Sequence, residues 1–73
     1  MFFRRKIDFK ILEYLKAKGK ATDRELYDAL SKEFNISYNQ LLSIIMQLEI
    51  EGFISVVFSR DYMTIMLKRI LTT

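Results

Sequence analysis

Residues 37–54 read SYNQLLSIIMQLEIEGFI, and this stretch carries start and stop signals for a helix. Ser37 is followed at the third position by Gln40, the S-x-x-Q pattern of a capping box, in which hydroxyl and amide satisfy the backbone donors of a new helix. Apolar residues then recur on one helical face, and Gly52 supplies a left-handed residue that ends the run. The pattern predicts a helix over residues 38–51 and a strand over residues 53–58.

The same stretch resembles the recognition helix and first wing strand of winged helix-turn-helix DNA-binding domains. The residues that carry the likeness are Ser37, Leu41, Ile45, Leu48, Glu49, Gly52, Phe53 and Ile54. The likeness extends from Ile11 to Leu67 and includes an I-L-x-x-L pattern at 11–15 and an E-L-x-x-x-L pattern at 25–30. It implies a mainly α fold with a small β-hairpin, an α+β domain of three helices whose third helix enters a DNA major groove.

Composition limits the chemistry open to the chain. Its 73 residues predict one domain, residues 1–73, and they include neither cysteine nor histidine. Disulfides, thiolate nucleophiles, zinc fingers and the usual general base are therefore excluded. We expect a protein that is not an enzyme and that has no cofactor and no metal site.

No segment has the length or composition of a membrane anchor. No apolar run approaches the roughly 20 residues of a membrane span. The opening MFFRRK places its aromatic residues before its charges, which is not the pattern of a signal peptide. The sequence therefore predicts a cytoplasmic, nucleoid-associated protein with no membrane partner.

Two further helices are predicted before residue 37. The first runs to about residue 18, where Gly19 ends it, and its start has two interpretations. Either Asp8 caps a helix beginning at the next residue, or the helix begins upstream near Arg4 and places residue 7 on the face of residues 11 and 15. A second capping box, Thr22 with Glu25, predicts a helix to about residue 34.

The turn after the second helix is short, and Asn35 in it tolerates left-handed geometry. Two capped helices joined in this way are typical of a helix-turn-helix, here residues 23–51. Lys20 and Ala21 are candidates for a short first strand. The strand at 53–58 is expected to turn through two or three residues at 59–61 into a strand over 62–67, which makes a wing of residues 53–67. The expected core is Leu12, Leu15, Leu26, Leu30, Leu41, Ile45, Leu48 and Ile54.

Charge is unevenly distributed around the total of +3. Residues 1–23 carry seven Lys or Arg against three acids, residues 24–61 carry three against six, and residues 62–73 add two cations. No cation lies between Lys32 and Arg60, an interval that contains the whole predicted recognition helix. Because phosphate neutralisation supplies much of the affinity for DNA, neighbouring segments must provide it here.

At about 100° per residue, the outward face of the predicted helix is uncharged and polar in its first half. The resemblance places the base-contacting positions on Asn39, Gln40 and Ser43, and Asn and Gln side chains pair well with adenine. The alternative is that these are ordinary surface residues of a first helical turn. Further candidates for contacts with bases or phosphates are Tyr38 and Gln47 on the helix, Arg60 on the wing, and the basic arm of residues 1–6 with Arg4, Arg5 and Lys6.

Apolar residues mark candidate contact surfaces. Leu42, Met46 and Ile50 form a stripe at four-residue spacing, which either packs beneath the C-terminal segment or contacts another subunit or protein. Residues at the chain ends, namely Phe2, Phe3, Ile70 and Leu71, are candidates for a homodimer interface. The four tyrosines are interpreted as residues at the edge of the core, and carboxylates such as Asp23 as surface or capping charges.

Two functional hypotheses follow. The first is a double-stranded DNA-binding transcriptional regulator that acts as a homodimer, with its third helix in the major groove and its wing and arm on the backbone. The second is a protein-interaction module of a larger assembly, which uses the apolar stripe.

Overall fold

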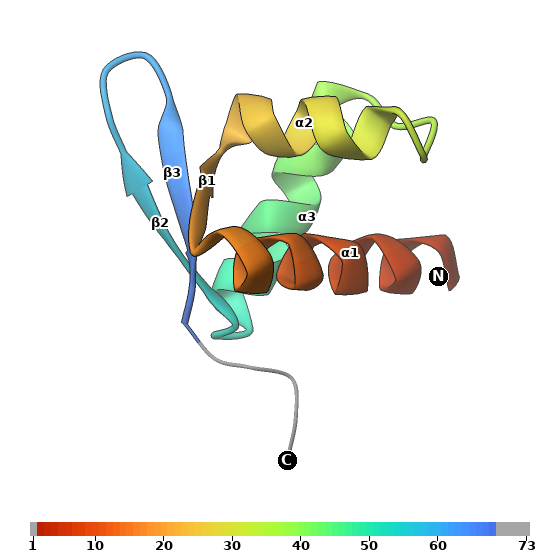
Figure 1. Cartoon of the computed structure of the whole chain (residues 1–73), viewed down its shortest axis with the longest axis horizontal. Coiled ribbons are helices and arrows are strands. Elements are labelled where there is room, and N and C mark those ends of the chain that lie inside the picture. The colour runs from red at the N-terminus through yellow and green to blue at the C-terminus, as the bar shows by residue number, and fades with distance from the viewer. Residues whose placement is uncertain (1, 69–73) are drawn as a thin grey trace.

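A computed structural model describes the backbone of residues 2–68 and the side chains of residues 6–68. This range contains three helices and three strands (Figure 1). The elements follow in the order α1 (Phe2–Lys18), β1 (Lys20–Thr22), α2 (Asp23–Ser31), α3 (Tyr38–Ile50), β2 (Ile54–Phe58) and β3 (Met63–Leu67). The expected α+β class is confirmed, and the short strand expected near Lys20 is present as β1.

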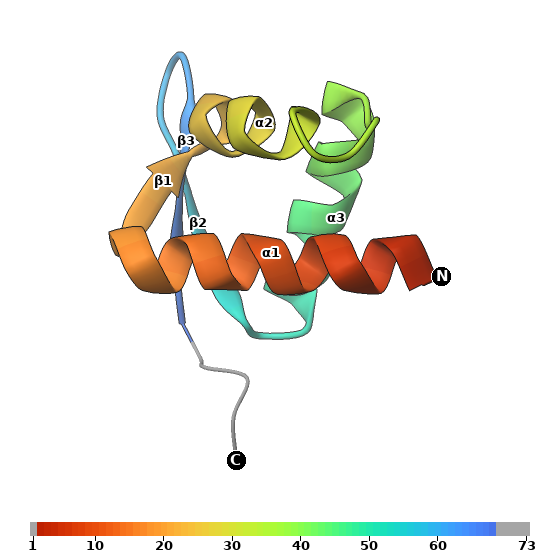
Figure 2. The same cartoon turned by 45° about the vertical axis from the view of Figure 1, so that its right-hand side comes forward.

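The strands form one antiparallel sheet in the order β1-β3-β2. β3 therefore lies in the centre, with Ala21 of β1 and Val56 of β2 both opposite Ile65. The three helices gather on one side of this sheet, and α1 runs across in front of α3 (Figure 2). β1 joins the end of α1 to the start of α2, whereas β2 follows α3 directly.

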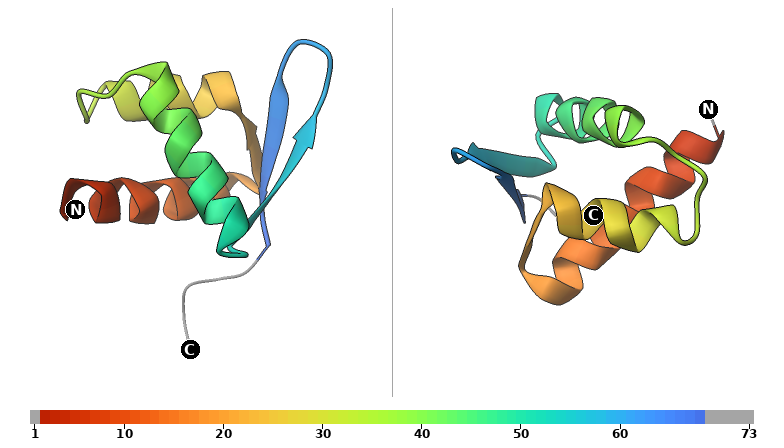
Figure 3. Two further views of the ribbon diagram at one scale, coloured as in Figure 1. Left: turned by 180° about the vertical axis from the view of Figure 1, so that it is seen from behind. Right: turned by 90° about the horizontal axis from the view of Figure 1, so that it is seen from above.

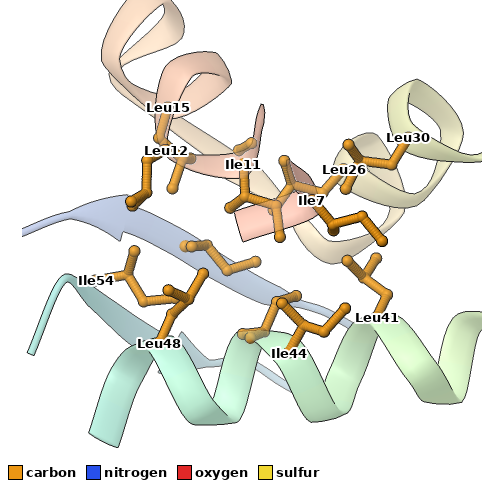
Figure 4. Packing of buried hydrophobic residues seen from close by; sticks show 13 residues of the cluster. Ile7, Ile11, Leu12, Leu15, Leu26, Leu30, Leu41, Ile44, Leu48 and Ile54 are labelled. Carbon is orange, nitrogen blue, oxygen red and sulfur yellow. The ribbon is translucent and has the colours of Figure 1, made fainter. Parts of the chain in front are cut away.

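The core lies between the helices and the sheet. All eight residues expected in it are buried, and Ile7, Ile11, Ala21, Ile44 and Ile65 join them. Figure 4 shows side chains from the three helices and from Ile54 converging on one apolar interior. Burial of Ile7 supports the upstream start of the first helix, because α1 begins at Phe2 and continues through Asp8 without a break.

Both helix-ending glycines adopt the left-handed conformation that the sequence predicts. Gly19 has φ +91°, and its N–H donates to the Leu15 carbonyl at 2.7 Å. Gly52 has φ +86°, its N–H donates to the Glu49 carbonyl, and the Phe53 N–H donates to the Leu48 carbonyl, both at 3.0 Å. This pair of bonds is a Schellman motif. It holds Phe53 in the turn, so β2 begins one residue later than expected.

One local prediction was wrong. α2 ends at Ser31 and not near Phe34, because the N–H groups of Glu33 and Phe34 both bond the Leu30 carbonyl and tighten the chain into a turn. Asn35 does not use the left-handed geometry that it tolerates, since no residue other than glycine has a positive φ within the described backbone. The hairpin turn is as short as expected, because the Ser59 N–H donates to the Tyr62 carbonyl at 2.8 Å and leaves Arg60 and Asp61 as the loop, although β3 begins one residue later than expected, at Met63.

Within residues 2–68, none of the helices combines the length and apolar character needed to cross a lipid bilayer. The expected dimer contacts Ile70 and Leu71 lie outside the described residues, as do the side chains of Phe2, Phe3, Arg4 and Arg5.

Candidate functional site

The starts of α2 and α3 are fixed by the two capping boxes that the sequence predicts. At α2 the Glu25 N–H donates to Thr22 Oγ1 at 3.1 Å, and the Thr22 N–H donates to Glu25 Oε1 at 3.2 Å. At α3 the Gln40 N–H donates to Ser37 Oγ at 3.1 Å, and the Ser37 N–H donates to Gln40 Oε1 at 2.8 Å. Each helix therefore begins in a defined position and direction.

A buried carboxylate joins the starts of α2, α3 and β3. Asp23, the first residue of α2, is only 6% exposed. Its Oδ2 accepts a hydrogen bond from the hydroxyl of Tyr38, the first residue of α3, and its Oδ1 accepts one from the Met63 N–H at 3.4 Å. The Tyr38 ring also packs edge to face against Tyr27 of α2, with centroids 5.8 Å apart. We call Asp23, Tyr38 and the Met63 N–H the Asp23 junction.

The electrostatics of the Asp23 junction favour the ionised acid and the neutral phenol. Burial by itself raises the pKa of Asp23, but the hydrogen bonds from Tyr38 and from backbone N–H groups outweigh it and hold that pKa below its ordinary value. The hydrogen bond to Asp23 raises the pKa of Tyr38, with burial and the nearby negative charge acting in the same direction. The interpretation of Asp23 as a surface or capping charge was therefore wrong.

Sequence patterns gave no signal for the Asp23 junction. Its three groups lie far apart along the chain, and an aspartate after a capping threonine is an ordinary feature of a helix start. Only the fold brings Tyr38 and Met63 to it.

Two of the candidate base-reading residues present free polar side chains. Asn39 and Ser43 are exposed on α3, and no hydrogen bond is formed by either side chain among the described residues. Gln40 is exposed as well, but its Oε1 belongs to the capping box, so only its Nε2 remains to donate. Gln47 is partly buried, and its Nε2 donates to Glu51 at 3.3 Å. The Tyr38 hydroxyl donates its hydrogen bond to Asp23, so it has no donor left for a phosphate.

Cations surround α3 without lying on it. Arg60 is exposed in the β2–β3 turn. Arg24 is exposed in the first turn of α2 and directly follows Asp23, whose carboxylate bonds the first residue of α3. Sequence reasoning did not select Arg24, although a helix immediately before a recognition helix commonly contacts the DNA backbone.

The N-terminal half of α1 lies on the opposite side of α3 from the hairpin, as Figure 3 shows from behind. Lys6 in this half is exposed. It lines a shallow groove of about 1110 Å³ between α1 and the end of α3, together with Phe9, Phe34 and Phe53. Lys6 and Arg60 therefore flank α3 and do not form one cluster.

The expected apolar stripe on α3 is not uniform. Met46 packs against the core and Leu42 is partly buried, whereas Ile50 is 78% exposed. Other exposed apolar residues lie in the hairpin, where Phe58 is 66% exposed and Val57 51% exposed.

The remaining predictions have mixed outcomes. Tyr14 and Tyr27 pack against the edge of the core as expected, but Tyr62 is 50% exposed and does not belong to it. Among the described residues, no group of three or more acids has the geometry to hold a metal ion.

Comparison with protein-family models, curated proteins and solved structures found no match to this chain.

Proposed function

We propose that the chain is a winged helix-turn-helix domain that binds double-stranded DNA and regulates transcription. The element order α1-β1-α2-α3-β2-β3 and the sheet order β1-β3-β2 support this assignment. In this interpretation α2 and α3 are the helix-turn-helix, α3 is the recognition helix, and the β2–β3 hairpin is the wing.

The observation that carries the proposal is the Asp23 junction. It bonds the first residue of α3 to the first residue of α2 and to the first residue of β3. These bonds fix the start of α3 relative to the start of β3, and direct reading of a groove requires that the reading residues be held in place. Asn39 and Ser43 contribute uncharged polar groups to the surface made of the α3 start and the hairpin, while Arg24 and Arg60 contribute charges at its edges.

The charged and uncharged residues of this surface have different roles. Asn39 and Ser43 read base edges in the major groove, because an amide can pair with adenine and a hydroxyl can donate or accept. Arg24, Arg60 and the basic residues at positions 4–6, which form no separate arm but belong to the first turns of α1, neutralise phosphates, which adds affinity without sequence preference. α3 carries no cation and its first half is uncharged, as we expect of a surface that reads base edges by hydrogen bonding.

The test is a fluorescence-anisotropy titration of the wild-type chain against random-sequence duplex at several salt concentrations. We expect binding that weakens steeply with salt. Arg24→Ala and Arg60→Ala should each lower the slope of log K against log salt by about one unit for each phosphate that the variant no longer neutralises.

Lys10→Ala is the matched control for these variants. Lys10 lies on α1 and pairs with Glu33 at 3.5 Å and Glu13 at 4.0 Å. Its removal costs the same formal charge, and an exposed ion pair of this kind contributes about 0 to 1 kcal/mol to stability. An equal decrease of salt dependence in all three variants would mean that binding follows net charge alone. No salt-sensitive binding by the wild type would refute the proposal.

A second candidate function is a protein-interaction winged helix. The high exposure of Ile50, Val57 and Phe58 favours it, since charged residues usually cover such positions on a monomer. This function predicts no salt-sensitive duplex binding, and loss of a protein partner on Ile50→Asp.

A further inference from the structure

The hydrogen-bond ladder of the hairpin defines which backbone groups of β2 are used. The Lys68 N–H donates to the Phe53 carbonyl, and the Ser59 N–H donates to the Tyr62 carbonyl, both at 2.8 Å. These bonds mark bonded positions at the two ends of the hairpin. Because bonded and non-bonded pairs alternate in an antiparallel ladder, Ser55 and Val57 are the β2 residues that exchange bonds with β3.

The backbone groups of Ile54, Val56 and Phe58 therefore point away from β3. β2 is the outer strand of the sheet, and within residues 2–68 β3 is its only pairing neighbour. Figure 1 shows the upper half of β2 at the margin of the molecule with no element beyond it, and Figure 3 shows the same from behind. Ile54 is only 1% exposed, so the outward N–H and C=O groups that remain free to pair with another strand are those of Val56 and Phe58, in the outer half of β2.

This edge lacks the features by which proteins usually prevent strand addition. β2 reads ISVVF, without charge, proline or glycine. Val57 and Phe58, at its outer end, are exposed. The opposite edge of the sheet differs, because β1 is only three residues long and includes Lys20. An uncharged strand of β-branched and aromatic residues at an open edge is a template for pairing.

We propose that this edge pairs antiparallel with the β2 edge of a second copy of the chain. A two-fold axis through Val57 sets Val57 opposite its own copy and Val56 opposite Phe58 of the copy. In this register the outward N–H and C=O groups of Val56 and Phe58 bond those of Phe58 and Val56 of the copy. The two Val57 side chains then face each other on the outer face of the sheet as a non-bonded pair.

Pairing with a second copy of β2 suits this strand better than pairing with a charged peptide would. The sequence of β2 places no like charges opposite each other, and the nearest charged residues, Glu51 and Arg60, lie beyond its ends. The pairing covers the exposed Phe58 with the partner strand. It also extends the core of a chain of 73 residues, a length at which a single apolar core gives little stability. The interface does not depend on whether the chain binds DNA.

Disulfide crosslinking tests the register directly, because the natural chain contains no cysteine. Non-bonded antiparallel pairs have Cα atoms about 4.5 Å apart, which is within the range that a disulfide spans. We expect Val57→Cys to form an interchain disulfide rapidly under mild oxidation, and to lose this ability in denaturant. Thr64→Cys is the control, because Thr64 is on the central strand β3 and lies away from the edge. Equal crosslinking of the two variants would overturn the proposal.

Sedimentation provides a second test that does not alter a residue touching the core. The wild type should be dimeric at about 0.1 mM, a concentration at which even weak dimers are populated. Val57→Lys sets two like charges opposite each other across the paired strands and should give a monomer, whereas Thr64→Lys places the charge on the same face one strand inward and should remain dimeric. A monomeric wild type, or a Val57→Lys variant that remains dimeric, would refute the edge interface.

Discussion

The hydrogen bonds that Asp23 accepts from Tyr38 and from the Met63 N–H are strongest when the acid is ionised, because both partners are donors. The pKa of Asp23 in the folded chain lies below the ordinary value of 3.8. The contribution of these bonds to stability is therefore complete above that ordinary value and is lost as the pH falls through the lowered pKa. The contribution of Tyr38 to stability changes at alkaline pH instead. Its raised pKa gives a contribution that is complete below pH 10 and is lost as the pH rises through the folded value.

Tyr38→Phe removes the bond while leaving the ring in place against Tyr27. We expect a loss of about 1.5 to 3 kcal/mol near neutral pH, the usual range for a hydrogen bond to a charged group. The difference from wild type should shrink as the pH falls below 3.8 and as it rises above 10. Urea unfolding across a pH series measures it, with Tyr62→Phe in the exposed hairpin turn as the control. A difference independent of pH would contradict the role assigned to Asp23.

Leu48 and Ile50 are neighbours on α3 with opposite environments. Leu48 is 2% exposed, whereas Ile50 is 78% exposed. Leu48→Ala should cost about 2 to 5 kcal/mol through reduced burial and a cavity, and Ile50→Ala should change stability by less than about 0.5 kcal/mol. Chemical denaturation compares the two. A loss below about 1 kcal/mol for Leu48→Ala would mean that the site refills, contrary to a close-packed core.

At the scale of elements, α3 separates the residues that we propose to read bases from the residues that hold its cap. Asn39 and Ser43 have free side chains, but Gln40 holds the capping box with Ser37. We expect Asn39→Ala to reduce discrimination between duplexes by about 1 to 3 kcal/mol for each base that is no longer read, with folding stability and salt slope unchanged. Competition binding against a selected site and its single-base variants measures this. Unchanged discrimination would remove Asn39 from the reading surface.

Gln40→Ala and Ser37→Ala should instead lower the free energy of unfolding. Loss of the cap costs about 0.5 to 2 kcal/mol, because backbone donors at the start of α3 lose their partners. Thermal unfolding of the DNA-free chain measures it. If Gln40→Ala unfolds like wild type but binds less selectively, Gln40 reads bases through its Nε2 and its capping bond contributes little.

Elements whose signals are local in the sequence could be predicted closely, and contacts between distant segments could not. The capping boxes at Thr22 and Ser37 and the glycines at 19 and 52 predicted helix boundaries well, because each signal acts within one turn of backbone. The end of α2 lacked such a signal and was misplaced. Asp23 was misread because its partners lie fifteen and forty residues away. The free edge of β2 was not foreseen either, since it depends on strand order.

At the scale of the whole molecule, association through β2 makes stability depend on concentration. A partner that binds only the folded chain stabilises it in proportion to the logarithm of its concentration over Kd. The thermal midpoint should therefore rise with protein concentration for the wild type and for Thr64→Lys, and stay constant for Val57→Lys. Scanning calorimetry over a wide concentration range measures this. A constant midpoint for the wild type would contradict a dimer coupled to folding.

The central position of β3 in the sheet has a consequence for synthesis on the ribosome. β1 lies ahead of α2, yet its pairing partner is β3, with Lys20 opposite Met66 and Thr22 opposite Thr64. Asp23 likewise depends on the Met63 N–H. As the chain emerges from its N-terminus, the helices can form early, but the sheet cannot close until residues 63–67 have left the exit tunnel. Until then the nascent chain keeps an unpaired β1 and an Asp23 without one of its donors, so a pause in translation before Met63 would hold it in an incompletely folded, protease-sensitive state.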